Sequence, residues 1–422
     1  MSRDSIPVTI LSGSLGAGKT TLLNHLLRNA GGTNVAVLVN DMGEINVDAE
    51  LVSEGSDLSV DDGITELSNG CICCELRDDL NAAVVRLARD RDFDHLVVES
   101  SGISEPGPVA RLFTTGSQAA ALYAIDSLVT VVDARLFYDA FGEEGRAERS
   151  VERDGDETRP LSDLLVEQVE FSNVVVLNKR DLVSEAELRT VEEIVATLRP
   201  DAEIVPATFA EVGVDRLLGR NLYDPATAAE AAGWKRALAE SDGANRDDRA
   251  AHGEHDEYDD HGHPGHEHHD HAHPDEVYGV TSFVYRRRRP FHPDRFASFL
   301  TALPESVVRS KGTCWIAGRE QQVLLGQAGP SVRVEAAGPW IASLPELDRE
   351  LYRSNRRTVE WDDEWGDRRT ELVVIGREMD EDALVAALDD CLLSDDEMDA
   401  DWGDFENRFP AEQGEERALV EP

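Results

Sequence analysis

Short apolar runs alternate with longer helical patterns through the first half of the chain. The runs are rich in β-branched residues, and the segments between them carry apolar side chains at helical spacing. This alternation is typical of a parallel sheet covered by helices on both faces. We therefore predict an α/β domain over residues 1–225, with a mostly parallel sheet flanked by helices and strands at Val8–Leu11, Val35–Val39, Leu96–Val98, Val129–Val132 and Val174–Leu177.

Two charged stretches interrupt the pattern. Residues 142–159 contain almost no large apolar side chain, so we expect an exposed insertion between a strand and a helix that opens near Leu161. Residues 226–276 form a predicted linker, which from Ser241 onward is rich in Asp, Glu and His. Such a composition is typical of a disordered segment rather than of a packed element.

Apolar periodicity returns after the linker and predicts a compact α+β domain over residues 277–395. We expect the acidic residues 396–422 to form a free tail, although Trp402, Phe405 and Phe409 offer a way to dock part of it. The predicted elements are strands at Tyr278–Tyr285, Cys314–Ala317, Val323–Leu325 and Leu372–Ile375, a helix entered at His292–Asp294 and a helix at Asp380–Leu388.

The net charge of the chain limits the kinds of molecule that it can bind. Asp and Glu number 85 against 41 Lys and Arg, a net charge of −44, and such a surface repels nucleic acid. Only four of the cations are lysines, a pattern that favours a cytosolic protein of a high-salt cell over a merely acidic mesophilic one. Three roles are open for the single basic cluster, Arg286–Arg289: neutralising nearby carboxylates, docking an acidic client, or forming a solvated strand end. No run reaches the ~18 apolar residues of a membrane helix, and no secretory signal is evident, so we expect a cytoplasmic protein without a membrane partner.

The strongest motif is G-S-L-G-A-G-K-T at residues 13–20, which fits the phosphate-binding pattern G-x-x-x-x-G-K-[S/T]. It follows a predicted strand and precedes a helical pattern, the context that such a loop requires. Glycines let backbone N–H groups converge on phosphate oxygens, the lysine reaches the β- and γ-phosphates, and the threonine hydroxyl binds Mg²⁺. The predicted nucleotide contacts are Gly13, Ser14, Gly16, Ala17, Gly18, Lys19, Thr20 and Thr21.

A second motif indicates the base. Asn178, Lys179 and Asp181 follow a predicted strand and fit the N-K-x-D pattern of GTPases. A carboxylate accepts hydrogen bonds from both guanine N1–H and the exocyclic amine, a pairing that adenine cannot return. The motif lies downstream of the phosphate loop, in the expected order, so we predict GTP rather than ATP as the nucleotide.

A carboxylate and a glycine lie between these two motifs. Glu99 ends a predicted strand and is expected to hold Mg²⁺ with Thr20 or to orient the attacking water, while the Gly102 amide meets the γ-phosphate. The alternative for Glu99 is a cap on the next helix. Together with Lys19, these two residues are the predicted catalytic groups. Asp133 ends another strand at the edge where ligands of such sheets bind, and its role is left open.

Three cysteines lie within four residues, at Cys71, Cys73 and Cys74. Thiolates are soft ligands, and this spacing favours Zn²⁺ or a similar ion, with a carboxylate or imidazole completing a tetrahedron. Buried structural cysteines and a redox pair are the alternatives. Cys314 and Cys391 are expected to pack inside the second domain.

Taken together, these motifs resemble the CobW-like GTPases, a metallochaperone family that includes zinc-regulated metalloprotein activators and cobalt-handling relatives. The resemblance implies an enzyme that hydrolyses GTP with Mg²⁺, binds Zn²⁺ or Co²⁺ at its C-x-C-C segment and delivers the ion to a client metalloprotein. It rests on GSLGAGKTT, NDMGEINVD, NGCICC, ESSGISEP and NKRD in the first domain, and on FVYRRRRPFHPDR, GDRRTELVVIG and LDDCLLSDDE in the second.

The resemblance also adds acidic candidates to the metal site. It makes Asn40–Asp48 the first switch segment, with Asp41 and Glu44 as carboxylates linked to the metal or to the nucleotide. Most relatives carry glutamate where Asp41 stands, and the aspartate side chain reaches about one methylene less. Acidic residues on a surface loop are the simpler alternative.

Histidines are concentrated in the linker, where nine of the twelve lie within residues 252–273. The family often carries such a loop, and neutral imidazoles on a flexible chain chelate divalent metals weakly and in alternative ways. We expect a weak metal-capturing segment, with an acidic solubilising linker as the alternative. Its candidate ligands are His261, His263, His266, His268, His269, His271 and His273.

Two further functions stay open at this point. One is a metal buffer or sensor in which the histidine-rich linker binds the ion and the nucleotide domain is a slow GTPase. The other is a cobalt-handling protein of cobalamin biosynthesis, because thiolate and imidazole sites accept Zn²⁺ and Co²⁺ with similar geometry. The sequence does not decide between a monomer and a homodimer.

Overall fold

The chain forms two compact units in a computed structural model. The first is built mainly from Met1–Gly233, and the second from Trp234–Gln327 and Val332–Val420. The structure describes residues 5–41, 64–68, 74–102, 106–114, 116–142, 150–152, 158–225, 232–238, 279–355 and 361–420.

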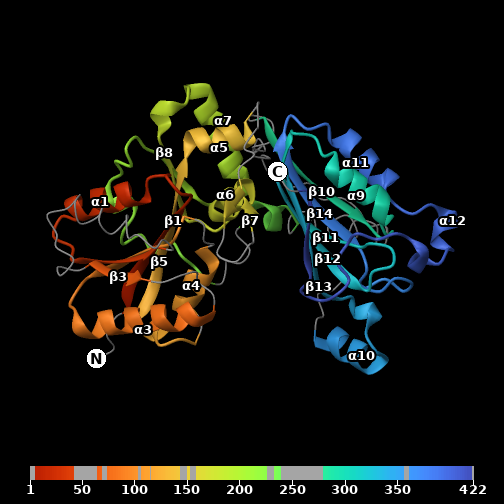
Figure 1. Cartoon of the computed structure of the whole chain (residues 1–422), viewed down its shortest axis with the longest axis horizontal. Helices are drawn as coiled ribbons and strands as arrows, with labels where there is room; N and C mark the ends of the chain where they lie inside the picture. The colour runs from red at the N-terminus through yellow and green to blue at the C-terminus, as the bar shows by residue number, and fades with distance from the viewer. Residues whose placement is uncertain are drawn as a thin grey trace, which may run out of the picture. The chain divides into compact units, whose positions relative to one another are not determined.

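The first unit is an α/β domain built on a seven-stranded sheet, in the order β3-β2-β4-β1-β5-β8-β9 (Figure 1). All neighbouring strands are parallel, which confirms the predicted fold class and the five predicted strands. Two short edge strands, β3 and β9, were not predicted, because neither contains a continuous apolar run. The strands are β1 (Ile6–Gly13), β2 (Val35–Asp41), β3 (Ile64–Ser68), β4 (His95–Glu99), β5 (Tyr123–Asp133), β8 (Val174–Asn178) and β9 (Glu203–Pro206).

Helices cover both faces of this sheet. They are α1 (Lys19–Asn29), α3 (Cys74–Asp90), α4 (Pro106–Thr114), α5 (Ala134–Phe141), α6 (Leu161–Glu170) and α7 (Glu185–Leu198). Successive strand residues point to opposite faces, so Val37 packs in a core cluster with α1, whereas Leu38 packs in another with α3 and α4. Burial on both faces explains why the central strands are continuous apolar runs.

The charged insertion predicted at residues 142–159 is described only in part. Strand β6 (Ser150–Glu152) pairs antiparallel with β7 (Thr158–Pro160), directly before α6. The predicted position is wrong in one respect, because α5 follows β5 and separates it from the insertion. Asp133 starts this helix by accepting hydrogen bonds from the backbone of Arg135 and Leu136. The insertion therefore joins two helices rather than a strand and a helix.

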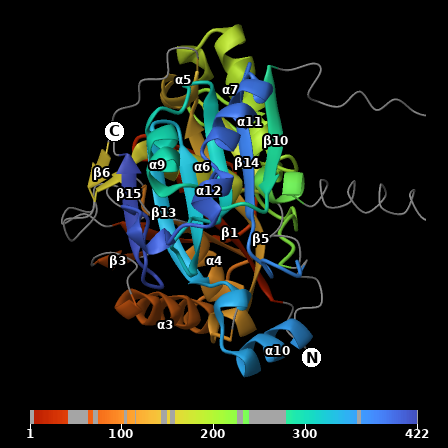
Figure 2. The same cartoon turned by 90° about the vertical axis from the view of Figure 1, so that its right-hand side faces the viewer.

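The second unit carries a six-stranded sheet in the order β10-β14-β11-β12-β13-β15. Strand β14 is antiparallel to β10 and β11, and β13 is antiparallel to β15. Helices α9 and α11 lie on one face of the sheet (Figure 2). The elements are β10 (Val280–Arg287), α9 (Pro293–Thr301), β11 (Val307–Cys314), β12 (Gln321–Ala328), β13 (Ser331–Pro339), α10 (Glu346–Asn355), β14 (Thr370–Arg377), α11 (Glu381–Asp390), α12 (Asp395–Met398) and β15 (Glu416–Val420).

Two details of this unit differ from the expectation. The strand predicted near Cys314–Ala317 in fact ends at Cys314 as β11, and β13 was not predicted at all. Glycines and charged residues interrupt the apolar pattern of both strands, which hides them from periodicity. Across both units, none of the helices in the described ranges is long and apolar enough to span a bilayer.

The acidic C-terminal segment is not a free tail, and that prediction is wrong. Phe409 is fully buried, with its ring centroid 5.7 Å from that of Phe296. Trp402 packs edge-on against Trp315 at 6.2 Å, and β15 extends the sheet by pairing with β13. Burial of aromatic surface and completion of a sheet edge therefore outweigh the repulsion among the many carboxylates of this segment.

The basic cluster Arg286–Arg289 is neutralised within the second unit. Arg286 donates to Glu371 at 2.9 Å, and Arg287 makes two hydrogen bonds of 2.7 Å to the carboxylate of Asp389. Arg289 pairs with Asp395. The cluster thus joins β10 to β14, α11 and α12, which favours the expected neutralisation of carboxylates over an open dock for an acidic client.

Part of the predicted linker is ordered. Residues 233–238 are helical and belong mostly to the second unit. The ring of Trp234 is contacted by two ammonium groups, with Lys235 Nζ at 5.3 Å and Lys311 Nζ at 5.1 Å from its centroid. These cation–π contacts attach the segment to β11 before the histidine-rich residues, which lie outside the described ranges.

A buried polar network lies at the amino end of the first sheet. His95 Nε2 is 2.9 Å from Thr9 Oγ1 and 4.0 Å from a carboxylate oxygen of Asp126. The other oxygen of Asp126 accepts a hydrogen bond from the backbone of Asn221. The network therefore fastens the last segment of the first unit to β1, β4 and β5. Burial lowers the pKa of His95 below its ordinary value of 6.5, although Asp126 acts in the opposite direction.

We predict that His95 makes the first unit sensitive to mild acid. Because the folded state lowers the pKa of this histidine, the unfolded state binds more protons below about pH 6.5, and the free energy of unfolding falls as the pH falls. Replacing His95→Gln should flatten this dependence between about pH 7.5 and about pH 5.5. All six tryptophans lie at or beyond Trp234, so tryptophan fluorescence follows the second unit while circular dichroism follows both. An equal pH slope in both proteins would contradict the prediction.

We also predict that the C-terminal segment stabilises the second unit. Phe409→Ala should lower its free energy of unfolding by about 3–5 kcal/mol, since it removes a fully buried ring. Urea denaturation followed by tryptophan fluorescence measures this loss. The half-buried Phe405 is the matched control, and Phe405→Ala should cost clearly less. Equal small losses in the two variants would indicate that the segment contributes little.

Candidate functional site

The loop between β1 and α1 has the backbone of a phosphate-binding loop. Gly13, Gly16 and Gly18 have φ angles of 144°, 77° and 110°, which other residues rarely adopt. A Cβ at Gly13 would lie 2.3 Å from the carbonyl oxygen of Val131, so only glycine fits there. Gly18 is the N-cap residue directly before α1, and no described side chain caps this helix end. Such a helix N-terminus suits an anion.

The side chains of the loop fit the same ligand. Lys19 is buried, and its ammonium donates to the carbonyl oxygens of Gly13 at 2.9 Å and Ser14 at 3.3 Å. The hydroxyl of Ser14 is buried and has no hydrogen-bond partner within the described ranges. Buried hydroxyls are normally paired, and a phosphate oxygen would supply the partner. Ala17 is buried and Thr21 is exposed on the first turn of α1.

The predicted magnesium ligands lie together. Thr20 Oγ1 donates to Glu99 Oε1 at 3.4 Å, and Glu99 is only 2% exposed at the carboxyl end of β4. A hydroxyl and a carboxylate are the hard oxygen ligands that Mg²⁺ prefers. The next helix, α4, begins at Pro106, so Glu99 is too far along the chain to cap it.

Gly102 closely approaches the tip of the phosphate-binding loop. A Cβ on this residue would lie 2.8 Å from the backbone nitrogen of Leu15 and 3.1 Å from Lys19 Nζ. Real Cβ atoms essentially never come within 3.0 Å of a backbone atom. The chain after β4 can therefore reach the expected position of the γ-phosphate only with glycine at this point.

Asn178 joins the two nucleotide motifs. Its amide group donates to the carbonyl oxygen of Ala17 at 2.8 Å, and its oxygen accepts from the backbone N–H of Ala210 at 2.8 Å. A Cβ on Gly18 would lie 2.4 Å from this amide nitrogen. Protein groups thus engage the Asn178 side chain on both sides, whereas Asp181, the predicted guanine-binding residue, is exposed three residues beyond the end of β8.

The structure shows two contacts of Asp133, whose role the sequence left open: it binds Lys179 and caps α5. Lys179 has a left-handed backbone with φ 59°, and its ammonium lies 2.7 Å from Asp133 Oδ2. The other oxygen of Asp133 caps α5. Lys179 of the N-K-x-D loop is therefore held by a carboxylate that is itself fixed by a helix end. The sequence signal was an aspartate directly before a helical pattern, which is typical of an N-cap.

Sequence reasoning missed the loop after β9. Arg180 N donates to Ala207 O at 3.1 Å, and Ala207 N donates to Leu177 O at 2.8 Å. These bonds, with that from Ala210 to Asn178, fasten residues 207–210 to the N-K-x-D loop. The only sequence signal was the neighbouring short strand β9, which itself was not predicted.

Comparison with known proteins identifies the family. Residues 7–206 match the CobW/HypB/UreG nucleotide-binding domain, and residues 280–392 match the cobalamin synthesis protein CobW C-terminal domain. The zinc-regulated GTPase metalloprotein activator 1 of Dictyostelium discoideum is 35% identical over 421 residues, covering 94% of this chain and 81% of that protein. The chain belongs to the CobW family.

Two bacterial members of the CobW family match over about half of this chain. The zinc chaperone CobW of Pseudomonas aeruginosa is 35% identical over 226 residues, which cover 51% of this chain and 60% of that protein. The zinc chaperone YjiA of Escherichia coli is 31% identical over 221 residues, covering 51% of this chain and 62% of that protein. The predicted resemblance is therefore confirmed, and both domains are those of a P-loop GTPase of the CobW family.

The predicted metal ligands of this CobW protein lie largely outside the described residues. These are Glu44, Cys71, Cys73 and all the linker histidines, while Asp41 and Cys74 are described by backbone alone. Strand β2 ends at Asp41, β3 ends at Ser68 and α3 begins at Cys74. Carboxyl ends of parallel strands share one sheet edge, so β3 ends at the edge that carries the phosphate-binding loop. The described ranges contain no group of three His, Cys, Asp or Glu placed to hold a metal.

The other two cysteines are packing residues, as predicted. Cys314 and Cys391 are free thiols in the core cluster of the second unit. Burial raises the pKa of the Cys391 thiol to about 11 and raises the pKa of Cys314 as well. Both side chains are therefore protonated at neutral pH and are poor metal ligands.

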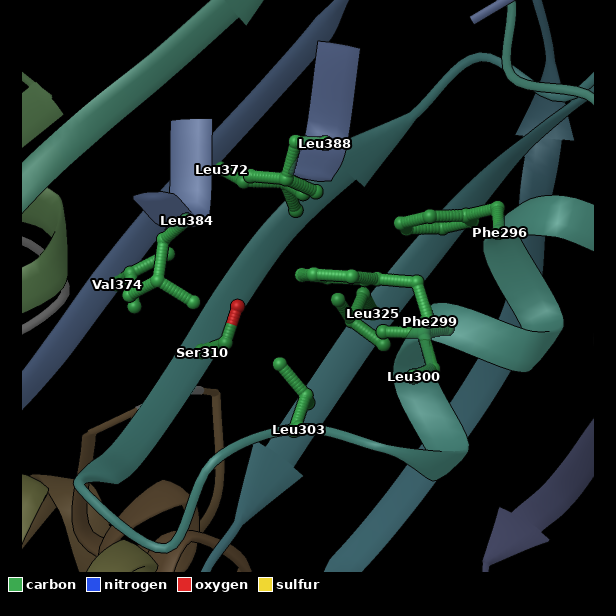
Figure 3. A pocket seen from close by; sticks show the side chains of 10 residues that line it. All are labelled: Phe296, Phe299, Leu300, Leu303, Ser310, Leu325, Leu372, Val374, Leu384 and Leu388. Atoms are coloured by element: carbon green, nitrogen blue, oxygen red, sulfur yellow. The ribbon is translucent and has the colours of Figure 1, made fainter. Parts of the chain in front are cut away.

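The cavity of the second unit does not belong to the site. It lies between α9, α11 and the sheet (Figure 3), and its volume of about 10 Å³ for a water-sized sphere has room for roughly one water. None of the predicted site residues lines it, so it is a packing gap of the core. The lining residues are Phe296, Phe299, Leu300, Leu303, Ser310, Leu325, Leu372, Val374, Leu384 and Leu388.

We predict that Gly102→Ala impairs the γ-phosphate side of the nucleotide site. The added methyl group would displace the backbone of Leu15 or the ammonium of Lys19, and misplacement by about 1 Å lowers kcat by about 100-fold. Steady-state hydrolysis of GTP measures the effect. The control is Gly107→Ala on α4, where a Cβ would meet only Phe171 at an ordinary distance of 3.7 Å. Wild-type rates in both variants would contradict the close approach.

Proposed function

We propose that this protein is a GTP-hydrolysing metallochaperone that binds Zn²⁺, or Co²⁺, at Cys71, Cys73 and Cys74 and transfers the ion to a client metalloprotein. The observation that carries the proposal is the coupling of a phosphate-binding loop to an N-K-x-D loop through Asn178, in a chain whose relatives are named zinc chaperones and a GTPase metalloprotein activator.

The nucleotide part of the proposal assigns a role to each described group. The loop glycines and Lys19 bind the β- and γ-phosphates, and Asp181 selects guanine by accepting two hydrogen bonds. Thr20 and Glu99 hold Mg²⁺, which neutralises charge on the phosphate oxygens when bound. The backbone of Gly102 lies beside Lys19 Nζ and suits the end of the γ-phosphate.

The metal part is supported by chemistry and by topology. Three thiols on one short connection form a soft donor set, which suits Zn²⁺ or Co²⁺ as cargo. Asp41 and Glu44 would supply carboxylates from the connection that follows β2. Both connections follow strands that end at the nucleotide edge of the sheet. In this proposal, a change at the γ-phosphate and a change in metal occupancy act on connections that follow the neighbouring strands β2 and β3.

The histidine-rich segment would supply weak capture before the ion reaches the thiolates. Imidazoles spaced at one or two residues bind divalent ions in many alternative ways, which suits exchange rather than retention. Thiolates in such a site need reducing conditions, and this supports a cytoplasmic location.

The test is a titration of Zn²⁺ and Co²⁺ in the presence of GDP and of a non-hydrolysable GTP analogue. Metal affinity should differ between the nucleotide states by about 5- to 150-fold, and by linkage the metal should shift the affinity for the analogue by the same factor. Replacing all three cysteines by serine should weaken metal binding by more than about 100-fold, since loss of supporting groups alone costs up to that much.

Three variants separate the parts of the proposal. Lys19→Ala should abolish the difference between the nucleotide states without removing the metal site. Cys391→Ser, a matched thiol in the second unit, should leave metal affinity unchanged. Deletion of residues 252–273 should leave one tight ion. Loss of all tight binding in that deletion would favour a histidine buffer instead, and equal metal affinity in both nucleotide states would exclude coupling.

A further inference from the structure

Phe209 is exposed to solvent, although the two alanines of the same loop are buried. The loop after β9 reads Ala207-Thr-Phe-Ala210, and both alanines are buried in the core cluster that contains α1. Phe209 is instead 72% exposed. Single exposed apolar residues are common, so this exposure alone has no meaning. The loop nevertheless buries both alanine methyl groups and exposes its one aromatic ring, and this arrangement calls for a structural explanation.

The backbone of this loop is held in an unusual conformation. Phe209 and Ala210 have φ angles of 51° and 55°, in the left-handed region that bulky residues seldom adopt. The loop stays there because Ala210 N donates to Asn178 Oδ1 at 2.8 Å and Glu211 N donates to Thr208 O at 3.1 Å. Conformations of this kind persist where the surroundings impose them, and they cluster at ligand clamps.

The loop also belongs to the base-recognition motif. The bond from Arg180 N to Ala207 O ties it to the residue directly before Asp181, and Asn178 ties it to Ala17 of the phosphate-binding loop. Within the described part of the first unit, the exposed large apolar side chains are Leu15, Leu182 and Phe209. All three lie on loops that leave β1, β8 and β9 at the carboxyl edge of the sheet.

We propose that Phe209 is a base-stacking residue of the nucleotide site, an inference that rests on the proposed function. Asp181 reads the edge of guanine through hydrogen bonds but offers nothing to the face of the base. An aromatic ring supplies that face, and stacking on a purine is tolerant of small shifts because the whole ring is a π surface. The left-handed backbone turns the ring out of the core, where a base can reach it.

The test compares a nucleotide with a ligand that lacks the base. GDP binding by Phe209→Ala should be roughly 5- to 100-fold weaker than in the wild type, whereas inorganic pyrophosphate should bind within about twofold of the wild type. Phe209→Tyr should restore GDP affinity, because it keeps the aromatic face. Melting temperatures should be unchanged, since the side chain is exposed and outside the core.

A spectroscopic variant gives a second readout. Phe209→Trp should show fluorescence quenching on addition of GDP, beyond any change in the wild type, and no quenching on addition of pyrophosphate. Leu347→Ala is the control truncation, because Leu347 is 82% exposed in the second unit. It should leave the affinity for both ligands unchanged.

The outcomes distinguish this inference from the proposed function. If the wild type and Phe209→Ala bind GDP with equal affinity, base stacking is overturned and the proposed function is not. An equal loss for GDP and pyrophosphate assigns Phe209 a role in loop structure and also overturns stacking. Wild-type protein that has no affinity for GDP or GTP overturns the proposed function, and base stacking with it.

Discussion

One buried amide group connects the parts of the nucleotide site. Asn178 holds the end of the phosphate-binding loop through Ala17 and the loop after β9 through Ala210, at 2.8 Å in each direction. The two loops leave strands that are not neighbours, since β5 separates β1 from β8 in the sheet. Asn178 therefore adds a direct hydrogen-bonded link between these two loops to the packing of Ala17, Ala207 and Ala210 in one core cluster. Loops that are held together before a ligand binds lose less conformational entropy on binding.

Carboxylates outnumber cations in this chain, and each of the four lysines makes a specific contact. The four lysines contact the phosphate loop, Asp133 and, in two cases, the ring of Trp234. Arginines of the second unit pair with carboxylates across elements, as Arg287 does with Asp389 and Arg295 with Glu397. Exposed pairs contribute about 0–1 kcal/mol each, so they specify which elements meet more than they stabilise the fold. The acidic C-terminal segment docks for a different reason, the burial of Phe409.

The motifs of the candidate site are local in the sequence, whereas the contacts that join them depend on which strands are neighbours in the fold. The phosphate loop, Glu99 and N-K-x-D are encoded by residue types at fixed spacing, and each follows an apolar strand that periodicity reveals. The role of Asp133 depends on where α5 begins, and that of residues 207–210 depends on β8 and β9 being neighbours. Neither fact is local to the sequence. The tail was misjudged because its charge is visible along the chain, while the core cluster in which Phe409 is buried is formed only by the folded second unit.

An excess of carboxylates makes it harder for the chain to bind one kind of metal ion selectively. A chain with a net charge of −44 offers divalent ions many weak oxygen sites, and hard ligands hold Zn²⁺ without distinguishing it strongly from abundant Mg²⁺ or Ca²⁺. Soft donors such as thiolates favour Zn²⁺ over Mg²⁺ and Ca²⁺. Cys314 and Cys391 are poor competitors for the ion, because both thiols are buried in the second unit and burial raises their pKa. The proposed thiolates at Cys71, Cys73 and Cys74 are then soft donors that follow β3 directly in the sequence. Specificity for the cargo and sensitivity to GTP would therefore arise from the same short connection between β3 and α3.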